Sequence, residues 1–370
     1  MKLLISAGEA SGDQHGARLL EALRKRRPDL SAFGMGGPRL AAAGLSVIVP
    51  SESLSVVGIS EVLEKLPSLV AAGNALVRTA RRERPDAAIL IDFPDFHGLL
   101  ARRLRRLGVP LIYYVSPQVW AWRRGRARSI ARRARRIITL FPFEADIYER
   151  LGADVVCAGH PLVDAVREGL REPSPLPAGK RRRLLLLPGS RSGELRRHWL
   201  PMAEAAVRLA RRHDLDVIAV RAPGLSEDLF AGAAEKGITV VDSGMHALLA
   251  TADLAFVASG TATLEAALCG APMIVVYKTS AASFAVGKLL VRVPWISLVN
   301  IVAGEEVVPE LLQDDVRADR LEKEGAALLD SPDRLVRMRV GLARAAARLG
   351  PPGGSERAAA AVLGALDPTS

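Results

Sequence analysis

Two aspartates and a histidine follow a fully apolar run of the sequence. Asp92, Asp95 and His97 come directly after Ala87–Ile91, whose composition predicts a buried strand. A buried strand gains no stability from carboxylates at its end, whereas a carboxylate placed there can take the proton of a substrate hydroxyl as that hydroxyl attacks. The segment therefore predicts acid–base chemistry at the tip of a strand.

A second candidate loop is SAGEASGD (Ser6–Asp13), which follows a short apolar run and leads into a helical pattern. Its glycines permit close backbone approach, and free N–H groups at a helix start favour anions. Glu9 and Ser11 are its candidate site residues, although a tight strand-to-helix turn without a ligand would show the same composition. The loop lacks the GxGxxG spacing of dinucleotide-binding folds, so an NAD site loses its main support.

A third loop, LLLLPGSRSGE, runs from an apolar strand into Gly189, Ser190 and Arg191 ahead of a long helical pattern. An arginine on such a loop can offer a bidentate fork to phosphate or carboxylate. A solvent-exposed arginine with no ligand is the alternative. The strand–loop–helix context favours ligand binding.

A fourth loop opens a predicted helix with Ser259, Gly260 and Thr261. Hydroxyls and free N–H groups at a helix start suit a diphosphate. Glu265 follows Thr261 by one helical turn, so it faces the same helix end and could accept hydrogen bonds from ribose hydroxyls. The alternative is an acidic residue that only stabilises the helix dipole.

Apolar strand-like runs alternate with helical patterns along all 370 residues, which predicts parallel sheets with helices on both faces. The pattern stops in the proline-rich segment 166–182 and restarts after it. We therefore expect an α/β fold with two Rossmann-like doubly wound domains that face a cleft. They span residues 1–165 and 183–345, joined by the linker 166–182. A helical tail over 346–370 could pack back on the first domain.

Charge and missing motifs narrow the function classes. The net charge is +11, and arginines are densest within Arg123–Arg136. Such a patch suits nucleic acid, anionic lipid or phosphorylated ligands, and a solvated helix face would also explain it. Trp120 and Trp122 adjoin the patch, but no nucleic-acid-binding signature accompanies them, so we expect no nucleic-acid partner.

The sequence contains no P-loop and no HExxH motif, so we expect neither a cofactor nor a metal. Its two cysteines, Cys157 and Cys269, lie in separate apolar segments, which favours a reducing cytoplasm. We find no signal peptide and no run of roughly 20 apolar residues that could span a membrane. A diphosphate cradle in one domain and a strand-tip carboxylate in the other together predict a glycosyltransferase.

The sequence resembles the lipid-A-disaccharide synthases, inverting glycosyltransferases of the lipopolysaccharide pathway. The matching stretches run in order across almost the whole chain: SAGEASGD, GGPRL, VVGISEVL, IDFPDF, YYVSPQVWAWR, LFPFE, GHPLVD, LLPGSR, ASGTATLE and SLVNIVAGEEVVPELLQ.

The resemblance implies a GT-B fold with a lipid-binding acceptor domain followed by a UDP-sugar-binding domain. The reaction it implies transfers 2,3-diacylglucosamine from its UDP form to 2,3-diacylglucosamine 1-phosphate (lipid X), and gives the β-1,6-linked disaccharide 1-phosphate and UDP. It makes Asp95 the catalytic base and places Arg191 at the diphosphate. Glu265, Asn300 and Gln313 correspond to positions that line the nucleotide site.

Two positions depart from the family pattern. His97 stands where the family usually has asparagine, and Val299 stands where proline precedes Asn300. The first leaves the role of His97 open, and the second loosens the backbone without removing the Asn300 amide. Asp92 is expected to be structural, as a cap or a partner of a neighbouring loop.

The resemblance also implies a cytoplasmic enzyme at the inner face of the inner membrane, because both of its substrates are acylated. The apolar segment Val56–Val77 is either an ordinary core helix or a patch that receives acyl chains at the bilayer interface. The alternative function is another UDP-sugar enzyme of the same fold, such as a peptidoglycan N-acetylglucosaminyltransferase or a UDP-sugar epimerase. An oligomer is compatible with the sequence.

Overall fold

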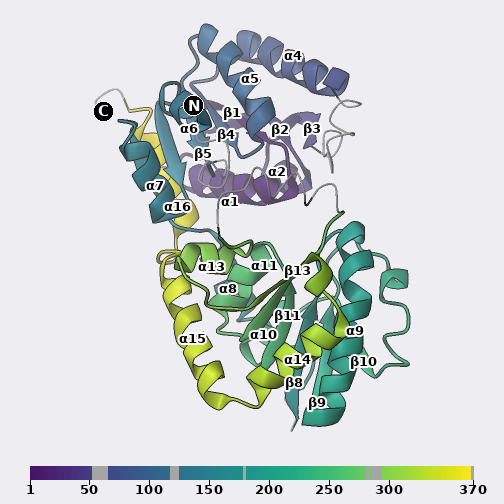
Figure 1. The fold of residues 1–370 in the computed structure, drawn as a ribbon. Coiled ribbons are helices and arrows are strands. Elements are labelled where there is room, and N and C mark those ends of the chain that lie inside the picture. The colour runs from purple at the N-terminus through teal and green to yellow at the C-terminus, as the bar shows by residue number, and fades with distance from the viewer. Residues whose placement is uncertain (52–65, 117–124, 178–180, 281–283, 285–293, 368–370) are drawn as a thin grey trace. The chain divides into compact units, whose positions relative to one another are not determined.

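The computed structural model describes residues 1–51, 66–116, 125–177, 181–280, 284 and 294–367 (Figure 1). The chain divides into two compact units. The first holds Met1–Pro161 together with Gly350–Ser370, and the second holds Leu162–Leu349. The C-terminal end of the chain thus belongs to the same unit as its beginning.

The first unit contains a seven-stranded sheet in the order β3-β2-β1-β4-β5-β6-β7, and the pairs are parallel. Its strands are β1 (Lys2–Ala7), β2 (Ser31–Gly36), β3 (Ser46–Pro50), β4 (Ala87–Ile91), β5 (Leu111–Tyr114), β6 (Arg136–Thr139) and β7 (Val155–Cys157). Its helices are α1 (Ala10–Arg26), α2 (Pro38–Ala42), α4 (Leu66–Glu83), α5 (Pro94–Arg106), α6 (Gly125–Ala131), α7 (Pro142–Glu149) and α16 (Gly354–Gly364).

Helices cover both faces of this sheet, which explains why a central strand such as β4 is apolar at every position and fully buried. Figure 1 shows α1 and α2 on one face and α4 and α5 on the other. Helix α16 packs against α1 through small residues such as Ala358 and Ala359. Arg357 Nε also donates a hydrogen bond of 2.8 Å to the Ala158 carbonyl, which fixes the end of the chain on this unit.

The second unit contains a six-stranded parallel sheet in the order β10-β9-β8-β11-β12-β13. Its strands are β8 (Arg182–Leu187), β9 (Leu215–Val220), β10 (Ile238–Val241), β11 (Leu254–Ala258), β12 (Met273–Tyr277) and β13 (Glu310–Leu312). Its α-helices are α8 (Leu162–Gly169), α9 (Ser192–His213), α10 (Met245–Ala250), α11 (Thr261–Leu268), α13 (Leu298–Ala303), α14 (Ala318–Leu329) and α15 (Pro332–Ala347), with short 3-10 helices at Glu227–Phe230 and Gln313–Asp315.

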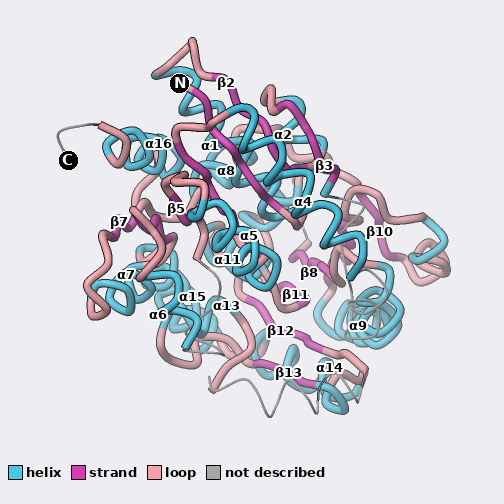
Figure 2. The backbone as a smooth tube through the Cα atoms, turned by 90° about the horizontal axis from the view of Figure 1, so that it is seen from above, coloured by secondary structure: helices cyan, strands magenta, loops and turns pink. Residues whose placement is uncertain are grey.

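Both units are Rossmann-like doubly wound sheets, so the predicted fold class is confirmed for each of them. In the second unit α14 lies against α9, and α15 packs on α11 and α13 (Figure 2). The segment 166–182, expected to be a linker, begins inside α8 and ends inside β8, because the pattern Leu162–Gly169 buries an apolar helix face.

Each sheet has one point at which the strand order reverses. In the first unit this point lies between β1 and β4, and in the second it lies between β8 and β11. Ligands of open α/β sheets bind outside the carboxyl ends of the strands at such points. The loops after these four strands therefore define where each unit should hold its ligand.

Candidate active site

The turn between β4 and α5 has a left-handed backbone at two consecutive non-glycine residues. Asp92 has a φ of 48° and Phe93 a φ of 51°. Non-glycine residues in this region cost on the order of 1–3 kcal/mol and persist only where the surroundings hold them. The turn is tied to the neighbouring strand end, because Asp92 N donates to the Val115 carbonyl at 3.2 Å. The strained turn presents Asp92 at the carboxyl end of β4.

His97, in the first turns of α5, holds this strained turn in place. Its ring is 1% exposed, Nδ1 lies 2.5 Å from the Asp92 carbonyl oxygen, and Nε2 lies 2.8 Å from Ser6 Oγ. Since a carbonyl only accepts, Nδ1 carries the proton and Nε2 accepts from the serine hydroxyl. Burial lowers the pKa of His97 to about 4, so the ring is neutral. The residue whose role the sequence left open fastens the tip of β1 to the tip of β4.

The SAGEASGD loop lies directly under this turn. A Cβ on Gly8 would overlap the ring of Phe93, so only glycine leaves room for that ring. Asp13, at the end of the same motif, is buried, and its carboxylate accepts from the N–H groups of Gly37 at 2.7 Å and Leu40 at 3.1 Å. Asp13 thereby caps the start of α2 and does not face a ligand.

Asp92 is the carboxylate whose protonation this arrangement changes most. Burial raises its pKa to about 6, and repulsion from Glu9 adds to the rise. The pairing of Ala7 with Ile91 brings the ends of β1 and β4 to one edge, which explains why Glu9 acts on Asp92. A carboxylate that titrates near neutral pH is suited to general-base catalysis.

Asp95 lies three residues after Asp92 and has a different environment. It occupies the first turn of α5, its side chain is 71% exposed, and it forms an ion pair with the guanidinium of Arg126 from α6. The other two candidates of this unit, Glu9 and Ser11, are exposed at the start of α1. The structure therefore places Asp92, Glu9 and His97 at the strand tips, and Asp95 in the first turn of α5 with Arg126 as its partner.

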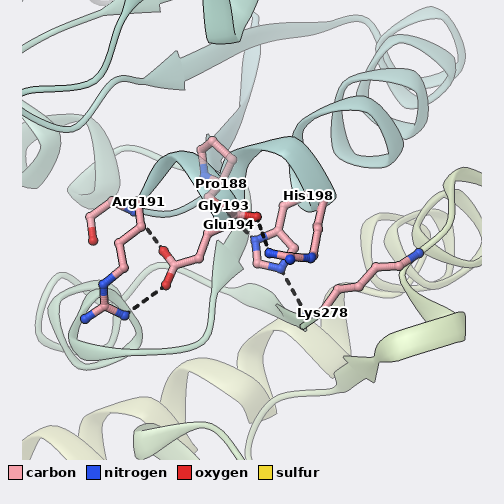
Figure 3. Close-up of polar contacts among 8 residues, drawn as sticks. Pro188, Arg191, Gly193, Glu194, His198 and Lys278 are labelled. Atoms are coloured by element: carbon pink, nitrogen blue, oxygen red, sulfur yellow. Dashed lines mark hydrogen bonds and ion pairs between the residues drawn. The ribbon is translucent and has the colours of Figure 1, made fainter. Parts of the chain in front are cut away.

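The loop between β8 and α9 in the second unit is organised by Glu194 (Figure 3). Its Oε2 accepts from Ser190 N at 3.0 Å, and its Oε1 lies 3.3 Å from Arg191 Nη1. Gly189 has a φ of 129°, and a Cβ there would lie 2.5 Å from Glu194 Oε2. The glycine thus admits the carboxylate that shapes the loop. Sequence reasoning did not single out Glu194, although its position three residues after the helix cap is the spacing of a capping box.

Arg191 is the cation that this loop presents. Its side chain is 65% exposed, and its partner Glu194 occupies one edge of the guanidinium. A guanidinium has five N–H donors, so most of them remain available to a phosphate. Ser190 is exposed beside it. The loop can therefore offer both a charged fork and backbone N–H groups to an anion.

A buried histidine also fastens this loop. His198 is 2% exposed, its Nδ1 lies 2.8 Å from the Pro188 carbonyl, and its Nε2 accepts from Lys278 N at 3.0 Å (Figure 3). Both partners fix the ring as neutral with the proton on Nδ1, and burial lowers its pKa. The ring joins the tips of β8 and β12. Nothing in the local sequence marks this role, because Lys278 lies far along the chain.

The β11–α11 loop lies next to the β8–α9 loop, because Leu187 pairs with Val257. Ser259 Oγ donates to the Ile296 carbonyl at 3.1 Å, and Thr261 is exposed at the helix start behind Gly260. The loops after β8 and β11 thus share one edge at the point where the strand order reverses.

Glu265 is partly buried and has a partner that sequence reasoning missed. Its Oε1 lies 3.1 Å from His246 Nε2, and the two side chains are 17% and 16% exposed. A Cβ on Gly169 would overlap the His246 ring, so α8 needs glycine where α10 approaches it. His246 therefore orients the Glu265 carboxylate, and only the tertiary packing of α8, α10 and α11 brings the pair together.

Asn300 is fully buried and has no capacity left for a ligand. Its Nδ2 donates to the Val308 carbonyl and to Glu310 Oε1, both at 2.9 Å, and its Oδ1 accepts from Val307 N and Val308 N. These bonds use both donors and both acceptor positions of the amide. In this structure the Asn300 side chain supports the backbone, and its assignment to the nucleotide site stays a prediction. Its amide holds Glu310, whose carboxylate in turn binds Ser297 N and Oγ.

Gln313 also serves the backbone. Its Oε1 accepts from Thr279 N at 2.7 Å and its Nε2 donates to the Thr279 carbonyl at 3.1 Å. Gln313 holds a left-handed φ of 51° to make this pair of bonds. It ties the end of β13 to the segment after β12, so it supports the edge of the sheet.

The family model for lipid-A-disaccharide synthetase matches residues 3–361 of the chain. The lipid-A-disaccharide synthase of Myxococcus xanthus is 42% identical, and the match covers 99% of this chain and 98% of that protein. That of Geobacter sulfurreducens is 43% identical over 98% of this chain and 96% of that one.

Solved structures share the fold at low identity. The calicheamicin glycosyltransferase CalG4 is 16% identical with a TM-score of 0.66, covering 99% of this chain and 98% of that one. MurG of Acinetobacter baumannii is 13% identical with a TM-score of 0.60, covering 98% and 99%. These likenesses establish the GT-B type of two-domain glycosyltransferase fold.

Proposed function

The chain belongs to the lipid-A-disaccharide synthetase family, and on that premise we propose its reaction. It transfers 2,3-diacylglucosamine from the UDP-activated sugar to 2,3-diacylglucosamine 1-phosphate, the acceptor. The products are the β-1,6-linked disaccharide 1-phosphate and UDP. The chain is accordingly a glycosyltransferase, and the readings as an epimerase or a peptidoglycan glycosyltransferase are not favoured.

The second unit binds the UDP part of the donor in this proposal. Arg191 takes the diphosphate, together with backbone N–H groups around Gly189 and Thr261. The exposed guanidinium on the loop after β8 supports this assignment. Glu265, oriented by His246 at 3.1 Å, accepts hydrogen bonds from the ribose hydroxyls.

Asp92, rather than Asp95, is the base that we propose. The observation that carries this choice is the strained turn that holds the Asp92 carboxyl partly buried beside Glu9, with its pKa raised to about 6. Asp95 instead is exposed and engaged with Arg126. A base is most effective when its pKa lies near the working pH.

The chemical step is a displacement at the anomeric carbon of the donor. The acceptor hydroxyl attacks this carbon, its proton passes to the Asp92 carboxylate, and the bond from the anomeric carbon to the UDP oxygen breaks. The leaving diphosphate carries the electron pair away. Arg191 and the N–H groups at the starts of α9 and α11 stabilise the charge that develops there.

We also propose that the enzyme works at the cytoplasmic face of the inner membrane. The acylated substrates and the net charge of +11 support contact with an anionic surface. Within the described residues, no helix combines the length and the apolarity that crossing a membrane requires. Residues 56–65 of the apolar segment lie outside the described part. In its remainder Leu76 and Val77 are buried as in a core helix, whereas Val70 is exposed.

One assay tests the proposed reaction. Purified protein is incubated with UDP-2,3-diacylglucosamine and the acylated sugar 1-phosphate, and UDP and disaccharide 1-phosphate are quantified. We expect both products in equal amounts. A folded protein that releases neither product, or that converts UDP-N-acetylglucosamine alone, would contradict the proposal.

A further inference from the structure

Helices α8, α10 and α11 of the second unit meet around a histidine and a glutamate (Figure 1). His246 Nε2, from α10, lies 3.1 Å from Glu265 Oε1, from α11. Among the residues that the structure describes, His246 is the one hydrogen-bond partner of the Glu265 carboxylate. Because a carboxylate only accepts, Nε2 carries the proton and donates it to this bond. Oε2 and the second lone pair of Oε1 are left for a ligand.

The pair is mostly buried, which makes it suited to selecting between ligands. The side chains of Glu265 and His246 are 17% and 16% exposed. A bound ligand excludes the remaining water, so every acceptor position of the carboxylate that it leaves without a donor carries a cost. A site built to hydrogen-bond a hydroxyl therefore rejects the analogue that lacks this hydroxyl.

The ring of His246 is held in place by the end of α8. A Cβ on Gly169, the last residue of α8, would lie 2.0 Å from the Nδ1 atom of His246. The φ of Gly169 is not positive, so its backbone would accept alanine and only the ring requires the missing side chain. The start of α10 is held as well, because a Cβ on its cap Gly244 would lie 2.2 Å from Pro175 Cδ. The segment 169–175 thus fixes both the helix and the ring of His246.

We propose that Gly169 and His246 are positioning residues that make the donor site selective for ribonucleotides over 2′-deoxyribonucleotides. The inference rests on the proposed function, in which Glu265 accepts hydrogen bonds from the ribose of UDP. His246 holds the carboxylate in the orientation in which the 2′- and 3′-hydroxyls donate to it together, and Gly169 holds the ring of His246. Neither residue contacts the nucleotide in this proposal, since both act through Glu265.

The place of Glu265 in α11 fits a ribose next to a diphosphate. In UDP the ribose is joined to the diphosphate through its 5′ carbon, so a ribose-binding group must lie close to the diphosphate site. Glu265 follows Thr261, the first residue of α11, by four residues, or about 6 Å along the helix axis. Helical side chains also lean back towards the helix start. The carboxylate is therefore within reach of a ribose whose diphosphate lies at the start of α11.

Calorimetric titration with UDP and with 2′-deoxy-UDP measures the selectivity. The wild-type protein should bind UDP roughly 10- to 100-fold more tightly than 2′-deoxy-UDP, the range expected for one hydrogen bond to a charged group. His246→Ala should weaken UDP binding and lose most of this preference. His246→Gln places an amide N–H near the position of Nε2 and should keep most of it. Equal binding of the two nucleotides by the wild type, or an unchanged preference in His246→Ala, would overturn the proposal.

His213→Ala is the matched control. His213 also lies beside a carboxylate of the second unit, with its Nδ1 3.8 Å from Asp330 Oδ1. It is the last residue of α9 and precedes β9, so it lies at the opposite edge of the sheet from the ligand-binding loops. This variant should keep the preference of the wild type for UDP.

A double-mutant cycle tests the role of Gly169. In the wild type, Gly169→Ala should displace the ring and lower both the affinity for UDP and the preference over 2′-deoxy-UDP. In the His246→Ala background the ring is gone, so the same substitution should change neither. Without ligand, Gly169→Ala should raise the unfolding temperature only in the His246→Ala background, because alanine is the better helix former. Equal effects of Gly169→Ala in the two backgrounds would overturn its positioning role.

These measurements require no turnover, so they separate the inference from the proposed reaction. A wild-type protein that shows the preference for UDP and forms no disaccharide would refute the proposed function and leave the role of His246 in place. A protein that forms the disaccharide and binds UDP and 2′-deoxy-UDP equally would refute the inference and leave the reaction in place.

Discussion

The β4–α5 turn of the first unit and the β8–α9 turn of the second are built alike and differ in what they do with a carboxylate. Each follows a buried strand beside the point where the strand order reverses. A neutral buried histidine fastens each turn to the end of another strand of the same sheet, His97 in one and His198 in the other. In the second turn, Glu194 accepts from Ser190 N and contacts Arg191. In the first turn, burial and the repulsion of Glu9 outweigh the hydrogen bond that the Asp92 carboxylate accepts from the Phe93 backbone.

This difference explains how one type of scaffold yields two kinds of chemistry. Where the carboxylate is neutralised inside the loop, the loop presents a cation and N–H groups, which suit a diphosphate. Where the carboxylate is desolvated and repelled, it becomes a base near neutral pH. The backbones of the two turns differ in the same way. Gly189 adopts its positive φ without strain, whereas the positive φ of Asp92 and Phe93 is strained.

The largest predicted effect on stability is a gain when the Asp92 carboxyl is replaced by the neutral amide of asparagine. Below pH 4 Asp92 is protonated in both the folded and the unfolded protein. Between pH 4 and 6 it ionises first in the unfolded chain, so the free energy of unfolding falls as the pH rises. Above pH 6 this loss of stability is complete. A pKa of about 6 against the ordinary 3.8 corresponds to about 3 kcal/mol. Urea unfolding at pH 8 should therefore show Asp92→Asn more stable than wild type by up to about 3 kcal/mol.

At pH 3.5 that gain should vanish, which is the internal control for Asp92→Asn. Glu194→Gln should instead lower stability at pH 8, because its charge is compensated in the native loop. If Asp92→Asn and Glu194→Gln both lowered the free energy of unfolding at pH 8, the two turns would not differ as described.

The next effect concerns the cation of the second turn. Arg191→Ala should weaken UDP binding roughly 10- to 100-fold, since a charge-assisted contact contributes about 1.5–3 kcal/mol. Calorimetric titration with UDP measures this. Arg196→Ala, an exposed arginine one turn further along α9, is the matched control and should bind UDP as wild type does. Unchanged affinity in Arg191→Ala would remove the arginine from the donor site.

The pH dependence of the reaction follows from the raised pKa of Asp92. Because a base must be ionised, kcat/KM should fall tenfold for each pH unit below about 6. Glu9→Gln removes one of the causes and should move this acid limb to lower pH, although burial, the larger cause, keeps the pKa above its ordinary value. An acid limb that Glu9→Gln leaves unmoved would disconnect it from Asp92.

The smallest effects compare the two histidines. Asn can replace only one of the two bonds that each ring makes, so His97→Asn and His198→Asn should each lower the free energy of unfolding by about 1 kcal/mol. The two variants should change different kinetic constants. We expect His97→Asn to lower kcat and His198→Asn to raise KM for the donor. Steady-state kinetics with both substrates varied would show whether the two supports serve different ligands.

Local sequence was sufficient to predict the fold and the loop between β8 and α9. Apolar strands, glycine-rich loops and helix starts repeat in order, and Arg191 is exposed on a loop whose shape its own neighbours determine. These features depend on residues close in the chain. The α/β architecture could be predicted for the same reason, because strand burial is visible as unbroken apolar runs such as β4 and β8.

The division of roles among the polar residues depends on distant contacts. Asp92 gains its raised pKa from burial in the folded unit and from Glu9 at the end of another strand, so the sequence could not distinguish it from Asp95. The side-chain oxygen of Asn300 accepts hydrogen bonds from the backbone N–H groups of Val307 and Val308. Glu265 is oriented by His246 from a different helix. Such pairings arise from packing between elements, which no spacing in the sequence encodes.

The central claim, that the base is Asp92, is tested most directly by comparing kcat in Asp92→Asn and Asp95→Asn under saturating substrates. Asparagine tolerates the left-handed backbone of residue 92, so the variant should fold and bind UDP. We predict that Asp92→Asn lowers kcat by roughly 10²- to 10⁴-fold, whereas Asp95→Asn retains kcat within about tenfold. An active Asp92→Asn beside an inactive Asp95→Asn would contradict the account.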